Sequence, residues 1–306
     1  MISGTPQAPG TTLQQPHVSV VIPTCNRPDL LQKCLDALAT SLARVADTPI
    51  DVIVTDDGAS MATRDLVASS YPWARWIQGP RRGPAANRNN GVRASAGTWI
   101  VFTDDDCIPE EGWMQAFLER IRSTPDCKVF EGCTVTDRER RRMDEESPEN
   151  RHGGYLWSCN MAIERRFFDR LGGFCETFPS PAMEDVDLRL RIQECKERFD
   201  FVPTAVVCHP FRAGKGLRFW VRHGESYVHL TERHPQLLGD HMWLAVPGLI
   251  VRRTVALMKG AVRYRFRGLP RTAAVLCVQT WFDIVARLRA TRRGSPPGES
   301  SPSARA

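Results

Sequence analysis

The sequence predicts an α/β fold with a mostly parallel sheet, on the strength of three observations. Residues 18–24 and 50–56 are almost continuous runs of β-branched side chains, typical of strands buried on both faces of a parallel sheet. The segment between them spaces its apolar residues as a helix does, so strand, helix and strand alternate. Acidic residues follow the second run and a further apolar run at 99–102, the position at which open α/β sheets bind ligands.

The composition of the chain limits the classes of ligand and the cellular location that we expect for it. The chain has 306 residues, enough for one large domain or two modest ones, and its net charge of +6 favours phosphorylated substrates, a membrane surface or nucleic acid. Its ten cysteines form no CxxC pair and its N-terminus lacks a signal-peptide pattern, so we expect reduced thiols in the cytoplasm. No apolar run approaches the roughly 20 residues that span a bilayer, so we do not expect an integral membrane protein.

The first half of the chain continues the alternation of strands and helices. Residues 1–16, rich in Gly, Pro, Thr and Gln, are predicted to be a flexible leader, and order is expected to begin at His17. Pro28 opens the first helix, whose leucines keep helical spacing. The remaining predicted elements are helices at 61–70, within 81–97 and at 110–122, and strands at 74–77, 99–102 and 128–136.

The second half is less regular. A charged segment at 137–154 predicts a mobile loop, and a strand at 155–163 precedes a short helix and a turn at Gly172 and Gly173. A helix at 183–199 opens with three acids, and two short strands within 199–210 lead to His209. Beyond residue 217 the pattern is helical, and residues 294–306 are predicted to be a disordered tail.

Three consecutive carboxylates, Asp104, Asp105 and Asp106, follow the strand at 99–102. Like charges this close repel one another, which protonation, a basic partner or a bound cation relieves. If the segment is extended, Asp104 and Asp106 point to the same side, and oxygen ligands suit Mg²⁺ or Mn²⁺ together with substrate phosphates. A solvated turn is the alternative, but the strand context favours a site for a metal and a diphosphate.

Five segments in series resemble the family 2 glycosyltransferases of the GT-A fold. They read VSVVIPTCNRPDLLQKCLDAL, VIVTDDGAS, RGPAANRNNGVRASAGTWIVFTDDDCIP, CNMAIERRFFDRLGGF and MEDVDLRLRI, and the match extends over roughly residues 17–210, about two thirds of the chain. The resemblance implies a mixed sheet flanked by helices, with the catalytic domain at 17–215 and a helical extension at 216–293.

The resemblance also implies a nucleotide-sugar site. By analogy with the family, Pro23 and Thr24 line the base and ribose, and Asp56 or Asp57 accepts a charge-assisted hydrogen bond from the base. The helix that carries Arg88 is similar to the segment bordering the nucleotide and diphosphate, although a solvated basic helix is its alternative. A UDP-sugar is the favoured donor, with GDP- and dTDP-sugars as alternatives.

A metal site follows from the same resemblance. Asp104 and Asp106 match the outer acids of the DxD motif, Asp104 towards ribose and metal and Asp106 as the metal ligand, while Asp105 takes the variable middle position. The implied ion is Mn²⁺ or Mg²⁺, a Lewis acid for the departing diphosphate. His209 resembles the histidine that completes the metal site in some relatives, and a purely structural histidine is the alternative.

Glu184 and Asp185 match the acidic pair in which the family's aspartate is the general base. Family 2 enzymes invert the anomeric centre, so the resemblance implies one displacement in which Asp185 removes the acceptor's proton. Acids that merely complement a helix dipole are the alternative interpretation. The QxxRW signature of processive synthases is not evident after this pair, which favours transfer of one sugar per encounter.

The C-terminal region is strongly basic. Residues 251–294 contain eleven arginines or lysines and one acid, interleaved with apolar residues at helical spacing. Such amphipathic helices are typical of an anionic membrane interface, and a helical cap with a solvated basic face is the alternative. Nucleic acid is not an expected partner, because no recognised binding module accompanies the charge.

The sequence therefore predicts an inverting, metal-dependent glycosyltransferase, cytoplasmic and peripheral on the cytoplasmic face of a bacterial membrane. Its acceptor would be a saccharide or lipid-linked saccharide in surface polysaccharide or glycolipid assembly. The main rival is a soluble transferase acting on a small metabolite or a protein. A nucleotidyltransferase would carry a glycine-rich first loop that PTCNRPD lacks, and a non-catalytic nucleotide-sugar-binding protein would not need the acids at 104, 106 and 185.

Overall fold

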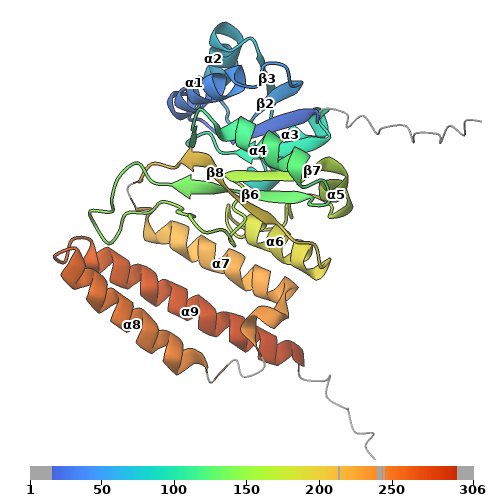
Figure 1. Cartoon of the computed structure of the whole chain (residues 1–306). Coiled ribbons are helices and arrows are strands. Elements are labelled where there is room, and N and C mark those ends of the chain that lie inside the picture. The colour runs from blue at the N-terminus through green and yellow to red at the C-terminus, as the bar shows by residue number, and fades with distance from the viewer. Residues whose placement is uncertain (1–15, 213, 240–242, 244, 295–306) are drawn as a thin grey trace, which may run out of the picture.

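An eight-stranded sheet in the order β3-β2-β1-β4-β7-β6-β8-β5 forms the centre of the protein (Figure 1). The computed structural model describes residues 16–212, 214–239, 243 and 245–294. The predicted leader at 1–16 and tail at 294–306 therefore lie outside the described residues, except for Pro16 and Gly294. The mixed sheet flanked by helices is the fold that the sequence predicts.

The first half of the sheet is parallel, as expected. Strand β1 pairs with β2 on one side and β4 on the other, and β2 pairs with β3. The strands are β1 (Val18–Thr24), β2 (Ile50–Asp56), β3 (Ala74–Gln78) and β4 (Trp99–Thr103), and the helices are α1 (Pro28–Ala43), α2 (Ala62–Ser70) and α3 (Pro84–Ala94).

The second half is mixed. Strand β7 pairs antiparallel with β4 and β6, whereas β8 pairs parallel with β6 and antiparallel with the short β5. The strands are β5 (Ile108–Pro109), β6 (Val129–Val135), β7 (Asn160–Glu164) and β8 (Asp200–Cys208), and the helices are α4 (Trp113–Ser123), α5 (Arg165–Arg170) and α6 (Glu184–Glu194).

Two predicted strands differ from the structure. The two short strands expected within 199–210 are one strand, β8, whose register against β6 shifts between Val202 and Val206, around a proline that cannot donate to the ladder. The strand expected at 155–163 begins only at Asn160. The reason is that the amides of Gly154, Tyr155 and Leu156 donate to the Glu131 carboxylate instead of to a neighbouring strand.

The core lies in two layers, one on each face of the sheet. One layer holds Val20 and Ile22 of β1 and side chains of α1, α2 and α4. The other holds Val21 of β1 and side chains of α3, α5 and α6. Because successive strand residues point to opposite faces, burial on both sides explains the unbroken apolar run of β1.

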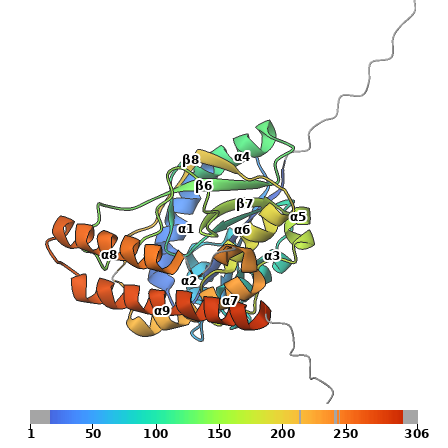
Figure 2. The same cartoon turned by 90° about the horizontal axis from the view of Figure 1, so that it is seen from below.

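Three long helices and a short one follow β8. They are α7 (Leu217–Arg233), the 3₁₀ helix η1 (Pro235–Leu238), α8 (Ala245–Arg263) and α9 (Leu269–Gly294). Helix α9 packs on α7, and α8 packs on α9, so α8 is the outermost layer (Figures 1 and 2). In the described part of the chain, no helix combines the length and apolar character that crossing a bilayer requires.

Candidate active site

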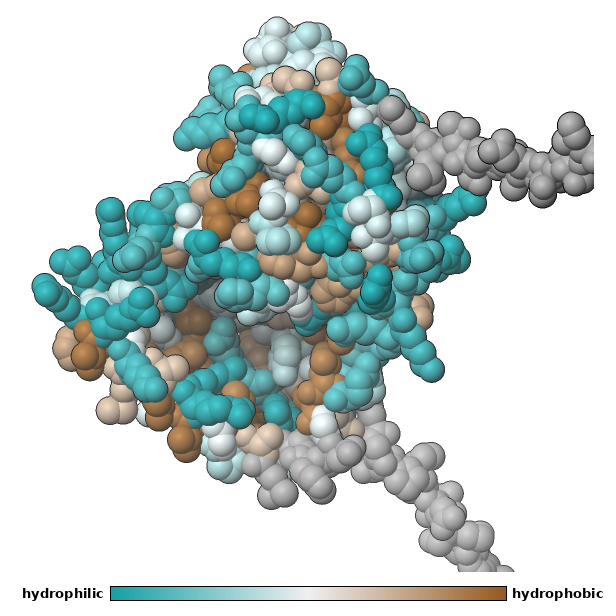
Figure 3. Space-filling view, viewed as in Figure 1, coloured by the Kyte–Doolittle hydropathy of each residue, from teal (hydrophilic) through white to brown (hydrophobic). Residues whose placement is uncertain are grey.

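A cleft of about 970 Å³ opens at the carboxyl ends of β1, β2 and β4. Its walls are the loops after these strands, the first turns of α3 and α6, the segment after β8, and one face of α7. The surface is hollowed between the sheet domain and the C-terminal helices (Figure 3). This is the position that the predicted sheet assigns to a ligand site.

Asp56 is the last residue of β2 and Asp57 follows it; Asp57 lines the cleft and Asp56 does not. The Asp57 carboxylate accepts hydrogen bonds from the amides of Arg81 and Gly83, at 2.8 and 3.0 Å, and so fixes the loop before α3. Burial raises the pKa of Asp57 above its ordinary value. Asp56 is buried and accepts from the Gly58 amide at 2.8 Å. The structure therefore separates two residues that the sequence left as alternatives.

Pro23 and Thr24 line the cleft at the end of β1. The Thr24 hydroxyl donates to Asp105 Oδ2 at 2.6 Å, so this side chain binds the acid cluster. Asn87 of α3 donates to the carbonyls of Thr24 and Thr55, at 3.2 and 2.8 Å. Asn87 thereby joins β1, β2 and α3 at the floor of the cleft. The sequence around Asn87 gives no indication of this role.

The three consecutive aspartates form a turn, which corrects the extended segment that the sequence predicted. Strand β4 ends at Thr103, and the Cys107 amide donates to the Asp104 carbonyl at 3.1 Å, closing the turn. Asp104 lines the cleft, whereas Asp105 is fully buried against Thr24 and Arg27. Burial raises the pKa of Asp105 to about 6. The middle acid is therefore a structural link between β1 and β4.

Asp106 and His209 form the group best suited to a divalent cation. A carboxylate oxygen of Asp106, the Cys107 sulfur and a ring nitrogen of His209 lie within 4.8 Å of one another. Asp106 Oδ1 is buried, lies 3.5 Å from His209 Nε2, and accepts no hydrogen bond from any described residue. Burial lowers the pKa of His209, which keeps the imidazole neutral and able to act as a ligand.

Two arginines occupy the other side of Asp106. Arg27 Nη1 lies 3.0 Å from Asp106 Oδ2, and Arg212 contacts the same oxygen. Asp106 and His209 offer the oxygen and nitrogen atoms that suit Mn²⁺ or Mg²⁺, so these two residues fit such an ion. Binding of the ion would require Arg27 and Arg212 to move away from Asp106. The Cys107 thiol does not fit as a ligand, since a hydrogen bond with Cys159 and burial raise its pKa and keep it protonated.

A buried arginine joins the acid cluster to the acidic pair of α6. Arg88 is 4% exposed, donates to Asp104 Oδ1 at 2.6 Å and to Glu184 Oε1 at 3.1 Å, and lies over the Phe174 ring. Burial raises the pKa of Asp104, but the charge and hydrogen bond of Arg88, together with the nearby His209 and Arg27, outweigh burial and leave that pKa below its ordinary value. The residues predicted at 88, 104 and 184 thus meet in one ion-pair network.

Glu184 and Asp185 begin α6 at the edge of the cleft. Burial, together with the neighbouring Asp185 charge, raises the pKa of Glu184 to about 7, and burial also raises the pKa of Asp185. The preceding residue, Met183, has a φ of 74°. Such a conformation is uncommon for a residue other than glycine and concentrates at functional sites.

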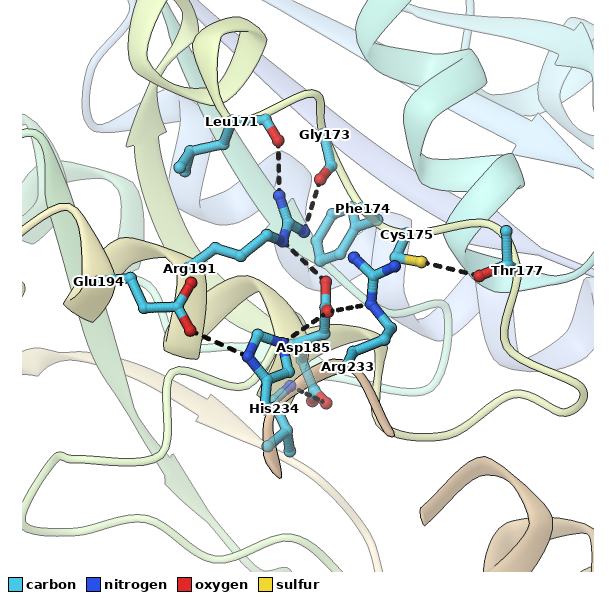
Figure 4. Close-up of polar contacts among 12 residues, drawn as sticks. Leu171, Gly173, Phe174, Cys175, Thr177, Asp185, Arg191, Glu194, Arg233 and His234 are labelled. Atoms are coloured by element: carbon cyan, nitrogen blue, oxygen red, sulfur yellow. Dashed lines mark hydrogen bonds and ion pairs between the residues drawn. The ribbon is translucent and has the colours of Figure 1, made fainter. Parts of the chain in front are cut away.

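The third acid of this helix, Asp187, holds α6 in place. Its carboxylate is fully buried and accepts from Arg191, Arg233 and His234 at 2.8 to 3.0 Å. Arg191 also donates to the carbonyls of Leu171 and Gly173 (Figure 4). Burial raises the pKa of Asp187, but these donors outweigh it and the net shift is downward. The sequence explained this acid only by the helix dipole, so its structural role was missed.

The part of the cleft wall that α7 forms is aromatic. Phe219, Trp220 and His223 of α7 line the cleft and form an aromatic cluster with ring centroids 5.1 to 6.0 Å apart, in which Phe219 and Trp220 meet edge to face and the other two pairs are tilted. Trp220 Nε1 is buried without a hydrogen-bond partner among the described residues. Burial lowers the pKa of His223 to about 4, so its ring is neutral at pH 7. This wall presents aromatic ring surfaces, which suit the apolar face of a sugar ring.

The charged segment at 137–154 borders the cleft, which Arg140, Glu146 and Ser147 help to line. It carries internal ion pairs, such as Arg138 with Glu145 at 2.9 Å. The Met143 amide donates to the Arg267 carbonyl at 3.0 Å, in the turn between α8 and α9. The loop therefore joins the cleft to the C-terminal helices, whereas its mobility stays a prediction.

Comparison with known proteins gives one family. Residues 19–177 match the model of Glycosyl transferase family 2. A pre-mycofactocin glycosyltransferase of Mycobacterium tuberculosis is 30% identical over 239 residues, which cover 71% of this chain and 48% of the relative. A Campylobacter jejuni protein, GalNAc(5)-diNAcBac-PP-undecaprenol beta-1,3-glucosyltransferase, is 31% identical over 125 residues, 39% of each chain.

A solved structure shares the fold. Mannosyltransferase PcManGT from Pyrobaculum calidifontis, in complex with GDP-Man and Mn²⁺, superposes with a TM-score of 0.56 and 16% identity over 92% of this chain and 89% of its own. The chain spans about half the length of the first curated relative that it matches.

Proposed function

The chain belongs to glycosyl transferase family 2, and on that premise we propose that it is an inverting hexosyl- or related sugar transferase that uses a nucleotide-sugar donor. The observation that carries the proposal is the network in which Arg88 joins Asp104 to Glu184. It brings the acid cluster at the end of β4 and the acidic pair of α6 to one cleft. This arrangement supports assigning donor binding and proton removal to neighbouring parts of the cleft.

The donor's nucleoside is assigned to the loops after β1 and β2. Pro23 and Thr24 border the base and ribose, and Asp57 is the acid that lines this part of the cleft. Arg27, Arg88 and Arg212 also line it and supply positive charge towards a diphosphate. UDP is the favoured nucleotide by family resemblance, while the GDP-Man bound to the Pyrobaculum neighbour keeps GDP open, and dTDP is the third candidate.

Asp106 and His209 are the residues that would hold Mn²⁺ or Mg²⁺, with Asp104 towards the ribose and the ion. A divalent cation supplies positive charge that stabilises a departing nucleoside diphosphate. Arg27 and Arg212, which now contact Asp106, would turn towards the donor phosphates when the ion binds.

Asp185 is the proposed general base. It lies at the cleft edge, and its raised pKa brings its basicity closer to neutral pH than that of a solvated aspartate. Asp185 takes the proton of the acceptor hydroxyl, the hydroxyl oxygen bonds to C1 of the sugar, and the bond from C1 to the diphosphate breaks. Attack opposite the leaving group inverts C1, and one sugar is transferred.

The acceptor is assigned to the space between Asp185 and the aromatic wall of α7. Trp220 and Phe219 offer ring faces to a sugar, which favours a saccharide acceptor, free or lipid-linked. The Campylobacter relative is named for an undecaprenol-linked acceptor, and we propose a similar role in surface polysaccharide or glycolipid assembly at the cytoplasmic face of a membrane. A soluble transferase acting on a small metabolite or a protein is the alternative.

Calorimetric titration with UDP, GDP and dTDP, each with Mn²⁺ and with a chelator, tests the donor site. We expect one nucleotide to bind with Mn²⁺ and to bind at least tenfold more weakly to Asp106→Ala. Asp126→Ala, an exposed aspartate, is the matched control and should bind as the wild type does. Absence of binding by all three nucleotides, or binding that Asp106→Ala does not weaken, would contradict the proposal. Release of pyrophosphate from a nucleoside triphosphate would instead indicate a nucleotidyltransferase.

A further inference from the structure

A stripe of exposed apolar side chains runs along α8. Val251, Val255, Met258 and Val262 are 60, 44, 65 and 75% exposed. At about 100° per residue their spacing places them within about 60° of one another around the helix. Helix α8 packs against α9 on another side, where Ala261 is buried. We call these four residues the α8 stripe, and exposed apolar patches of this kind mark interaction surfaces.

The turn after α8 adds a fifth apolar residue. Phe266 is 65% exposed and stands between Arg265 and Arg267. Arg265 and Phe266 have φ values of 49° and 62°, a conformation that is uncommon outside glycine. The Arg267 carbonyl accepts from Met143, which fixes the turn to the loop that borders the cleft. The turn therefore holds an aromatic side chain out into solvent.

Unpaired cations accompany the stripe. Arg252, Lys259 and Arg263 are exposed and lie about 100° from the stripe, all on one flank of α8. Within the described ranges, neither these three side chains nor the two arginines beside Phe266 form an ion pair, whereas Arg253 on another side of the helix pairs with Asp283 at 2.7 Å. The exposed flank of α8 is thus apolar in its middle and positive along one edge.

We propose that the α8 stripe and Phe266 insert into the interface of an anionic lipid membrane. The apolar side chains enter the boundary between headgroups and acyl chains, and the arginines and lysine extend to the lipid phosphates. A second copy of the chain is a poorer occupant, because two identical surfaces would bring their unpaired cations together. The proposal goes beyond the transfer reaction and does not depend on it.

The same contacts orient the cleft on the membrane. The loop that Met143 fastens to the turn also contributes Arg140 and Glu146 to the cleft wall. A membrane-bound turn would therefore hold the loop that borders the cleft close to the lipid surface.

Sedimentation of the purified full chain with lipid vesicles tests the surface. The vesicles contain phosphatidylcholine alone or phosphatidylcholine with phosphatidylglycerol. One variant combines Val251→Ser, Val255→Ser, Met258→Ser and Val262→Ser, and a second combines Arg252→Gln, Lys259→Gln and Arg263→Gln. The matched control combines Met61→Ser and Trp73→Ser, exposed apolar residues (43 and 40%) of the sheet domain.

We expect the wild type and the control to bind the anionic vesicles and not the neutral ones. Each lysine or arginine near an anionic surface contributes about fivefold in partitioning, so the second variant should bind about a hundredfold more weakly. The stripe variant should lose binding although its charge is unchanged. Unaltered nucleotide titrations and melting temperatures would show that both variants are folded and that the donor site is independent of the surface.

Three outcomes would overturn the proposal. If the wild-type chain stays in the supernatant with both vesicle types, the α8 stripe and Phe266 do not bind membranes. Equal binding to neutral and anionic vesicles would remove the role of the cations. A wild-type dimer in light scattering that becomes a monomer in the stripe variant would make a second copy the occupant.

Discussion

Replacing the buried Arg88 with methionine tests the electrostatic account of the cleft most directly. Methionine keeps much of the apolar stem and removes the guanidinium, so Asp104 and Glu184 lose their shared partner. A buried carboxylate without a partner either stays charged or takes up a proton. Asp104, whose side chain is 25% exposed, then determines most of the stability loss, because burial already raises the pKa of Glu184 to about 7.

The expected loss of stability follows from the free energy needed to protonate Asp104. Neutralising a carboxyl with an ordinary pKa of 3.8 requires about 5 kcal/mol at about pH 7.5 and about 1.6 kcal/mol at about pH 5. This sets the ceiling for Asp104, and breaking buried ion pairs destabilises proteins by about 3 to 5 kcal/mol. We therefore expect Arg88→Met to lower the free energy of unfolding by about 3 to 5 kcal/mol at about pH 7.5 and by less than about 2 kcal/mol at about pH 5.

Urea unfolding at the two pH values, followed by tryptophan fluorescence, measures the loss. Arg93→Met is the matched control, since Arg93 is 58% exposed and lies 3.8 Å from Glu176, and it should change stability by less than about 0.5 kcal/mol. A loss below about 1 kcal/mol for Arg88→Met at about pH 7.5, or an equal loss at both pH values, would refute the reasoning.

Three further predictions concern α6. Asp185→Asn should lower transfer by about 10²- to 10⁴-fold, the usual contribution of a general base, while calorimetric nucleotide binding stays unchanged; unaltered turnover would exclude this base. Transfer should rise with pH through a pKa above that of a solvated aspartate, because burial raises the pKa values of Asp185 and Glu184 and the base acts deprotonated; a rate profile complete below about pH 4 would contradict this. Asp187→Asn should destabilise the protein by about 3 kcal/mol in urea unfolding at neutral pH, since Arg191 and Arg233 lose a buried counter-charge. The lowered pKa of Asp187 makes its stabilisation complete above the ordinary aspartate pKa and lost as pH falls through the native value, so a gap that persists at low pH would argue against the ion pairs.

The sequence identified most of the residues that meet in the cleft, because they follow strands whose carboxyl ends share one edge of the sheet. It did not identify their partners. Arg27 and Arg212 contact Asp106 from positions 79 and 106 residues away in the chain, and neither belongs to a motif that specifies the contact. The turn at Asp104 was missed because an apolar run predicts a strand but does not show at which residue its hydrogen bonds to the neighbouring strands end.

The sequence by itself determined the alternation of strands and helices from β1 to β4, the burial of β1 on both faces, and the amphipathic pattern of α8, whereas it missed β5 and divided β8 into two strands. These features depend on the local spacing of apolar residues and on which side chains become buried, and residues close together in the sequence determine both. Only the tertiary structure decided that Asp57 rather than Asp56 lines the cleft, that Asp187 is buried, and that Arg88 joins Asp104 to Glu184. Those outcomes depend on charges from distant segments meeting in a space that excludes water, where each must find a partner.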